Sequence, residues 1–141
     1  MNTTRFSIPV RVYYEDTDSG GVVFYVNYFK FMERCRTEWL RSLGHEQRQL
    51  TEEEGILFVV RNASAEYKRP ARLDDALIVD LRVESIGRSQ LAVVQRVCRA
   101  TAAGELEELV IGTTQVVCVD ISVFKPIPIP AGIRQQLEQF R

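Results

Sequence analysis

The amino-acid sequence predicts an α+β fold in which one antiparallel sheet wraps around a long central helix. Three observations predict it: a strand, a long helix and four further strands follow one another; the helix carries a single apolar stripe; and 45% of the 141 residues are apolar. An apolar stripe must be buried, and one face of a single antiparallel sheet can bury it. A chain of this length suits one core, so we expect residues 1–141 to form a single domain.

The first strand is expected over residues 5–15, where apolar and polar side chains alternate. Its apolar face holds Phe6, Ile8, Val10, Val12 and Tyr14. Pro9 cannot donate a hydrogen bond to a neighbouring strand, so we expect this strand at an edge of the sheet. The run Asp16-Thr17-Asp18-Ser19-Gly20-Gly21 then ends the alternation and is typical of a turn.

The long helix is expected to begin near Asn27, where the apolar spacing changes to three and four residues. Its apolar stripe holds Tyr28, Phe31, Met32, Cys35, Trp39, Leu40 and Leu43. Asn27 is a suitable N-cap, and Gly44 is a suitable residue just beyond the C-terminal end. Such a helix has about seventeen residues and spans roughly 25 Å, enough to cross a sheet. Residues 45–55 are polar and predict a short helix or a loop.

Four more strands are expected at Ile56–Tyr67, Ala76–Ile86, Gln90–Ala100 and Leu106–Asp120. Short connections join the last three, which predicts an antiparallel meander. Prolines in the segment 125–130 should keep it extended and outside the sheet, before a short last helix near residues 131–140. The outer face and the edges of such a sheet favour pairing with a second copy of the chain.

The composition argues against several classes of function. The formal net charge is −1, so no basic excess favours nucleic acid as a partner. The apolar stretches are shorter than the roughly 20 residues of a membrane span, and the N-terminus lacks a signal pattern. His45 is the only histidine, and Cys35, Cys98 and Cys118 are far apart, which argues against a zinc site. We expect three buried thiols in a reducing compartment, and hence a cytoplasmic protein.

Candidate chemistry lies in the turn before the long helix. Unpaired N–H groups and the positive end of the dipole gather at a helix start, where they can hold a carbonyl oxygen that develops negative charge. The carboxylate of Asp16 or Asp18 could reach the same carbonyl carbon, directly or through a water. These parts are the minimum for acyl transfer. From spacing alone, a local role in turns and caps is the simpler explanation of both aspartates.

Several ordered blocks, spread over nearly the whole chain, carry a family resemblance. They read YEDTD from Tyr14, GVV from Gly21, NY from Asn27, ERCRTE from Glu33, FVVR from Phe58, EY from Glu66 and PARLDD from Pro70. Together they resemble the signature of the 4-hydroxybenzoyl-CoA thioesterase family, and within it the Tol-Pal-associated acyl-CoA thioesterase branch. The resemblance implies a hotdog fold, hydrolysis of acyl-CoA thioesters, and no metal or cofactor.

By this resemblance, Asp18 matches the catalytic carboxylate, which acts as nucleophile or as general base on water, and Asp16 supports the loop. Tyr25 matches the position whose backbone N–H polarises the thioester carbonyl. This position is usually histidine in the Tol-Pal-associated branch and tyrosine in the aromatic-acyl branch. With tyrosine here, this chain keeps the backbone N–H donor but lacks an imidazole that could transfer protons. Family active sites lie at dimer interfaces, often within tetramers. We therefore expect a homodimer or homotetramer in which Asn27, and Val60 of a second subunit, line the substrate pocket.

Coenzyme A carries phosphates, which lysine and arginine side chains bind. The candidates near the expected groove are Lys68, Arg69, Arg72 and Arg88. Each of them is otherwise explained as an ordinary solvated surface charge. Arg88 ranks first, because the family often contacts the nucleotide from the connection in which it lies.

We therefore predict hydrolysis of a small acyl-CoA, short aliphatic or aromatic, to the free acid and CoA. The alternative is a non-catalytic module that binds acyl-CoA or acyl-carrier protein. A hotdog dehydratase is a third reading, weakened because His45 lies at the end of the helix. Glu33, with Thr37, is a lower-ranked candidate, since another hotdog branch carries its carboxylate on the central helix; both are otherwise polar residues of an amphipathic helix.

Overall fold

The computed structural model describes residues 5–141 and confirms the expected order of elements. The strands are β1 (Phe6–Arg11), β2 (Ile56–Tyr67), β3 (Ala76–Ile86), β4 (Gln90–Ala100), β5 (Leu106–Asp120) and β6 (Lys125–Pro126). The α-helices are α1 (Asn27–Ser42), α2 (Gln47–Gln49) and α3 (Ala131–Glu138), with a 3-10 helix at Tyr14–Asp16 and a π-helix at Leu50–Glu54. Strands β2 to β5 have the bounds that the sequence predicts.

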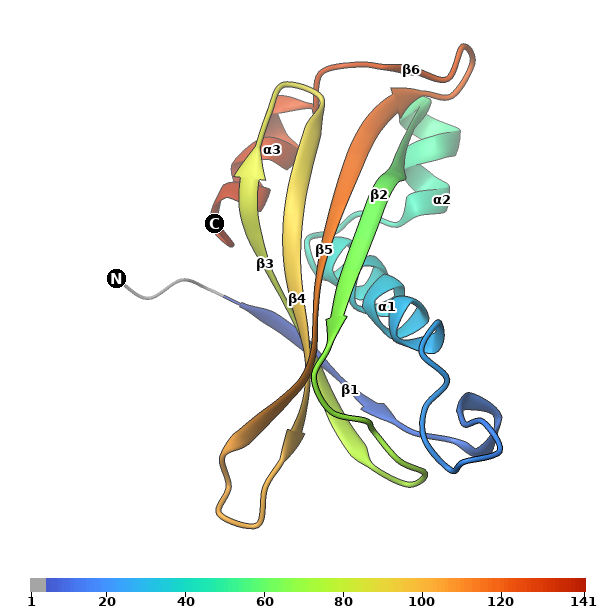
Figure 1. Ribbon diagram of the computed structural model, residues 1–141. Coiled ribbons are helices and arrows are strands. Elements are labelled where there is room, and N and C mark those ends of the chain that lie inside the picture. The colour runs from blue at the N-terminus through green and yellow to red at the C-terminus, as the bar shows by residue number, and fades with distance from the viewer. Residues whose placement is uncertain (1–4) are drawn as a thin grey trace.

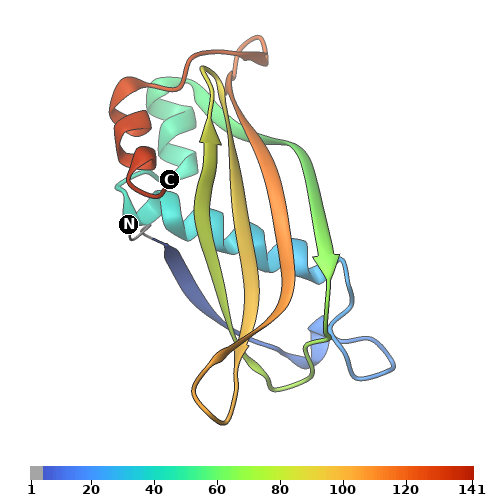
Figure 2. The ribbon, with the colours of Figure 1, turned by 60° about the vertical axis from the view of Figure 1, so that its left-hand side comes forward.

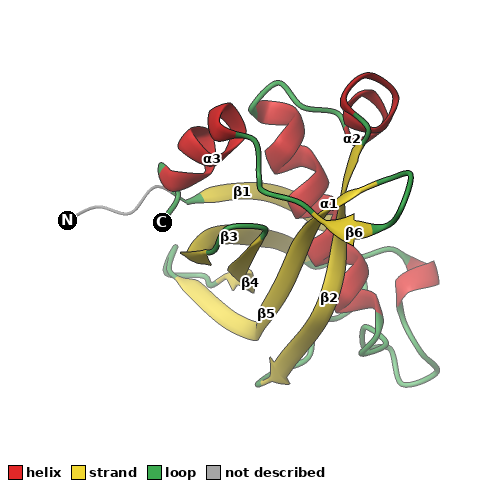
Figure 3. Ribbon diagram, turned by 90° about the horizontal axis from the view of Figure 1, so that it is seen from above, coloured by secondary structure: helices red, strands yellow, loops and turns green. Residues whose placement is uncertain are grey.

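The sheet has the strand order β1-β3-β4-β5-β2, with β6 beside β5. Strands β3, β4 and β5 pair with their neighbours in antiparallel register, which confirms the predicted meander. β1 lies at an edge of the sheet, the position that Pro9 requires. The sheet curls, and α1 crosses its concave face (Figures 1 and 2), while α3 packs near the top of the sheet, as the view from above shows (Figure 3).

The apolar stripe of α1 fills the space inside the curled sheet. Its buried members are Tyr28, Phe31, Met32, Cys35, Trp39 and Leu40. They belong to one hydrophobic cluster with inward-facing strand residues such as Val79, Val93 and Leu109. Burying one large apolar side chain contributes about 1.5–3 kcal/mol to folding. The sheet therefore holds α1 firmly, and with it the segment that leads into the helix.

Two expectations near the N-terminus are wrong. The first strand, β1, ends at Arg11, because the chain then turns into a 3-10 helix in which Tyr14 is 82% exposed. The Tyr13 N–H stabilises this turn by donating to the Asp16 carboxylate at 2.8 Å. Asn27 is the first residue of α1, and Val26 takes the cap position. The Asn27 side chain does not cap the helix but donates a hydrogen bond to the Asp16 backbone carbonyl.

The segment 125–130 was expected to stay outside the sheet, yet its first two residues pair with β5. This pairing is possible because Ile127 keeps the N–H that its proline neighbours lack and donates it to the Cys118 carbonyl at 3.0 Å. The prolines limit the pairing to the two residues of β6.

All three cysteines are free and buried, as expected. Burial raises the pKa of the Cys35 thiol to about 12 and that of Cys118 to about 11, so neither is a thiolate near neutral pH. No helix within residues 5–141 is long and apolar enough to cross a membrane.

Candidate active site

The turn between β1 and α1 is held by Asp16. The Asp16 backbone carbonyl accepts hydrogen bonds from the Phe24 N–H at 2.9 Å and from the Asn27 side-chain amide at 2.9 Å. Its carboxylate accepts the Tyr13 N–H. These bonds tie the strand, the turn and the helix start together, so Asp16 supports the loop, in agreement with the family resemblance.

Asp18 lies at the tip of this turn with its side chain exposed. Its carboxylate accepts the Gly20 N–H at 2.8 Å, and its backbone N–H donates to the Val22 carbonyl at 2.9 Å. Gly21 closes the turn at a φ of 78°, which glycine adopts without strain. Within the described chain, Asp18 lines none of the three cavities considered below. The carboxylate is therefore fixed in place and open to solvent in the isolated chain.

The helix start presents free backbone donors beside this turn. Neither the Tyr25 N–H nor the Val26 N–H donates to an acceptor within residues 5–141. The Tyr25 carbonyl, in contrast, accepts the Tyr67 hydroxyl at 3.2 Å, which fixes the peptide orientation. Free N–H groups at the positive end of a 16-residue helix are suited to an oxygen that carries negative charge.

A cavity of about 250 Å³ opens beside Tyr25, and we call it the aromatic cavity. It is lined by Val23, Tyr25, Tyr28, Tyr67, Lys68, Arg69 and Pro70. The Tyr25 and Tyr67 rings meet edge to face at 6.0 Å, and the buried Tyr28 hydroxyl accepts the Ala71 N–H at 3.0 Å. Burial raises the pKa of Tyr28, so its hydroxyl stays neutral. The cavity therefore has an apolar, aromatic wall and a basic rim.

Three of the four predicted CoA-binding cations lie near this cavity: Lys68 and Arg69 line it, and Arg72 follows Pro70 and Ala71. Lys68 lines it and pairs with Glu108 at 2.7 Å, and this pairing raises the pKa of Lys68. Arg72 is exposed, and its backbone forms a bridge with Val22 of the Asp18 turn. The structure thus brings Tyr25, Lys68 and Arg72 around one end of the sheet.

Arg88 lies at the other end. Ala76, the first residue of β3, pairs with Arg11 beside the Asp18 turn. From there β3 runs to Ile86, about 33 Å along the strand at 3.3 Å per residue, and Arg88 follows in the next connection. Figure 1 shows the β3–β4 connection and the turn before α1 at opposite ends of the molecule. One chain therefore does not bring Arg88 to its own Asp18.

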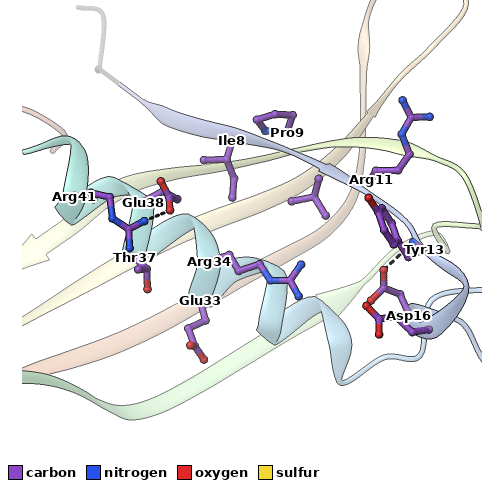
Figure 4. Close-up of a pocket in the computed structure, with 12 residues that line it drawn as sticks. Ile8, Pro9, Arg11, Tyr13, Asp16, Glu33, Arg34, Thr37, Glu38 and Arg41 are labelled. Carbon is purple, nitrogen blue, oxygen red and sulfur yellow. Dashed lines mark hydrogen bonds and ion pairs between the residues drawn. The ribbon is translucent and has the colours of Figure 1, made fainter. Parts of the chain in front are cut away.

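Two further cavities lie along α1. The outer groove, of about 690 Å³, separates α1 from β1 and reaches Tyr13, Glu15 and Asp16 of the turn (Figure 4). The inner cavity, of about 450 Å³, lies between α1 and the sheet and includes Val60 of edge strand β2. Glu33 and Thr37 line both cavities. Val60, predicted to serve a neighbouring subunit, is 51% exposed at a bulge in β2.

Sequence reasoning missed two polar residues in this region, Arg36 and Gln95. Arg36 donates to the Gln95 side-chain oxygen at 2.9 Å, and Gln95 is fully buried. Residue type alone predicts solvent exposure for both. The one available signal was that Gln95 follows the apolar run Leu91–Val94 of β4.

Known proteins match most of this chain in sequence. Residues 20–104 match the model of the thioesterase superfamily. The chain is 45% identical to the acyl-CoA thioester hydrolase YbgC of Escherichia coli O6:H1, over 99% of this chain and 100% of that protein. It is 42% identical to the acyl-CoA thioesterase YbgC of Haemophilus influenzae, over 95% of each.

Solved structures show the same fold. The 4-hydroxybenzoyl-CoA thioesterase of Pseudomonas sp. strain CBS-3 superposes with a TM-score of 0.83 at 22% identity, over 92% of this chain and 97% of that one. At that identity the likeness concerns the fold alone. Because the family match covers more than half of the chain and the relatives align with nearly all of it, this chain belongs to the thioesterase superfamily and has the hotdog fold.

Proposed function

We propose that this chain hydrolyses the thioester of a small acyl-CoA, short aliphatic or aromatic, with Asp18 as the catalytic carboxylate. The observation that carries the proposal is the free Tyr25 N–H at the start of α1, beside the turn that fixes Asp18. Acyl-CoA thioester hydrolysis is also the activity named for relatives that align with nearly the whole chain. The free, buried cysteines support a reducing, cytoplasmic setting.

In the proposed reaction the thioester carbonyl oxygen accepts the Tyr25 N–H. Asp18 takes a proton from a water as that water attacks the carbonyl carbon, and the helix start holds the resulting oxyanion. The tetrahedral intermediate then expels the CoA thiolate, which receives the proton. Direct attack by the carboxylate would instead form an anhydride that water opens; it needs the same two groups. Neither route requires a metal or a cofactor.

A second copy of the chain is part of the proposal. Asp18 is exposed in the isolated chain and lies far from Arg88, while β2 carries Val60 at an open edge of the sheet. A homodimer or homotetramer that pairs these regions would cover Asp18 and bring Arg88 and Val60 of one copy to the turn of another. Lys68 and Arg72 would then meet the CoA phosphates from the same chain as Asp18.

The exposure of Asp18 also favours a second candidate, a non-catalytic module that binds acyl-CoA or acyl-carrier protein. Asp18 lines none of the three cavities, and an aspartate that only stabilises a turn would have the same exposed position. The two candidates differ in turnover, because a binding module forms a complex with the ester and releases no thiol.

Thiol release from short aliphatic, long aliphatic and aromatic CoA esters tests the proposal. The unmodified protein should hydrolyse at least one class, and Asp18→Asn should lower kcat on the order of a hundredfold or more. Asp74→Asn is the matched control, because Asp74 is an exposed loop aspartate at a φ of 70° that asparagine tolerates. Full activity in Asp18→Asn refutes the assignment, and tight binding without any thiol release favours the binding module.

A further inference from the structure

The inner cavity under α1 combines apolar walls with a half-buried cation, Arg36. Its apolar lining residues include Leu57, Phe58, Val60, Leu91, Val93 and Val116. Its polar lining residues are Glu33, Arg36, Thr37 and Gln47, and among them Arg36 of α1 is a half-buried cation. An apolar cavity with few polar groups is a typical binding site for the apolar part of a small molecule.

Arg36 has little to neutralise it. One of its N–H groups donates to Gln95, whose own amide donates to the Met32 carbonyl at 3.0 Å, so this neutral contact is fixed. Within residues 5–141, no carboxylate lies within ion-pair distance of Arg36. Burial lowers the pKa of Arg36, and the more distant charge of Glu33 partly opposes that shift. The side chain still remains a cation at neutral pH.

A half-buried guanidinium with unused N–H donors favours one class of partner. Arginine presents five N–H groups in a planar fork, and a carboxylate can accept two of them in parallel. Leaving such a cation without an anion in an apolar cavity is unfavourable. Two other half-buried arginines already pair with carboxylates: Arg96 with Asp80, and Arg99 with Asp75 and Glu107. Arg36 forms no such pair within residues 5–141, so its remaining N–H groups can bind a ligand.

The position of Arg36 suits the far end of an acyl chain. The outer groove begins at the turn that carries Asp16, and it meets the inner cavity at Glu33 and Thr37. Both side chains project from the same side of α1 (Figure 4). Arg36 lies nine positions after Asn27, the first residue of α1, which is about 13.5 Å along the helix. A carbonyl held at the helix start therefore leaves room for several carbons before Arg36.

We propose that the inner cavity receives the acyl chain and that Arg36 binds a carboxylate at its far end, so that CoA monoesters of dicarboxylic acids are preferred substrates. This inference rests on the proposed thioesterase function. Gln95 positions the guanidinium, and the apolar walls bind the methylene groups. Glu33, at the rim, repels the same carboxylate and limits the preference.

The test compares kcat/KM for pairs of CoA esters with equal carbon number, such as adipyl-CoA and hexanoyl-CoA. The unmodified protein should prefer the adipyl ester about tenfold or more, the scale of a charge-assisted hydrogen bond. Arg36→Met should abolish this ratio, and Glu33→Gln should raise it. Lys30→Met is the matched control, because Lys30 is an exposed cation of α1 that lines none of the three cavities.

The ratio is measured within each variant, so a general loss of stability cancels. Equal rates on both esters in the unmodified protein, an unchanged ratio in Arg36→Met, or a stronger preference for 6-hydroxyhexanoyl-CoA would each overturn the inference. If no ester is hydrolysed, the proposed function fails. Calorimetric binding of adipyl-CoA and hexanoyl-CoA to Asp18→Asn then still tests whether Arg36 binds a carboxylate in the inner cavity. Tighter binding of adipyl-CoA that depends on Arg36 supports the inference, and equal binding of the two esters rejects it.

Discussion

The two ends of α1 differ in how their backbone groups are satisfied. At the C-terminal end, Gly44 adopts a φ of 92°, its N–H donates to the Arg41 carbonyl at 3.0 Å, and the His45 N–H donates to the Leu40 carbonyl at 2.9 Å. This is the Schellman arrangement, which uses the last free carbonyls of the helix. At the N-terminal end, the Tyr25 and Val26 N–H groups remain free within the described chain.

The C-terminal end of α1 therefore serves the stability of the fold, whereas the N-terminal end has donors left for a ligand. The C-terminal end is closed further by α3, where the Gln136 side-chain oxygen accepts a hydrogen bond from the His45 ring at 2.6 Å and the Gln136 amide donates to the Leu43 carbonyl at 2.9 Å. The N-terminal end is held as well, because the Asn27 side chain bonds to the Asp16 carbonyl, but the Tyr25 and Val26 N–H groups have no acceptor within residues 5–141. A held helix start with free donors is ready to bind an oxygen of a ligand without rearranging.

The largest expected effect follows from removing one free donor. Tyr25→Pro deletes the N–H proposed to hold the carbonyl oxygen, and kcat should fall on the order of a hundredfold, as it does when an oxyanion donor is removed. Val26→Pro is the comparison variant, because it removes the neighbouring free N–H at a φ of −66° that proline adopts, and it should cost less activity. Steady-state kinetics with melting curves would measure both. Equal losses in the two variants would show that the Tyr25 N–H has no special role.

A smaller effect is expected from loosening the same end. Asn27→Ala removes a largely buried hydrogen bond to the Asp16 carbonyl, and it should lower the free energy of unfolding by about 1–2 kcal/mol. Activity should fall too, because the Asp18 turn loses one of its supports. Asn62→Ala removes an exposed side-chain hydrogen bond to Gln115 and serves as control. Urea unfolding would measure the loss of stability in each variant. Equal losses in Asn27→Ala and Asn62→Ala would contradict the role given to Asn27.

The C-terminal end should respond in stability alone. Gly44→Ala places a side chain at a positive φ and should cost about 1 kcal/mol of unfolding free energy. The thioesterase kcat should not change, because this end lies about 25 Å from the proposed site along the helix. Calorimetric melting and thiol-release assays check the two parts. A large loss of kcat at full stability would break the distinction between the ends.

The smallest effect is expected at the Tyr25 side chain. Tyr25→Phe keeps the backbone N–H and the aromatic wall, so kcat should change by about twofold at most, the scale of a surface substitution. Steady-state rates on aromatic and aliphatic esters would measure it. A loss comparable with that of Tyr25→Pro would assign the chemistry to the hydroxyl instead of the amide.

The sequence predicts most of the fold because glycine and proline mark the ends of its elements. Strands β2 to β5 begin and end where expected, and Gly44 ends α1 as expected. The end of β1 was missed because Tyr14 continues the alternation although it is 82% exposed in the 3-10 turn. Alternation alone does not reveal that Asp16 bonds back to Tyr13.

The site was only partly within reach of the sequence. The Asp18 turn and the helix start could be proposed as one site because they are adjacent in the chain. The distance between Arg88 and Asp18 depends on the direction of β3, and the contact between Arg36 and Gln95 depends on how α1 sits on β4. Such contacts join residues far apart in sequence, and residue types that are usually exposed give no sign of them.

The carbonyl stretch of a bound thioester tests the central claim most directly. In Asp18→Asn, which should hold the ester uncleaved, infrared difference spectra with a ¹³C-labelled carbonyl would show whether the oxygen accepts hydrogen bonds at the helix start. The stretch should shift to lower frequency than in water, and Tyr25→Pro should remove the shift. A bound ester whose carbonyl stretch matches that in water would contradict the account.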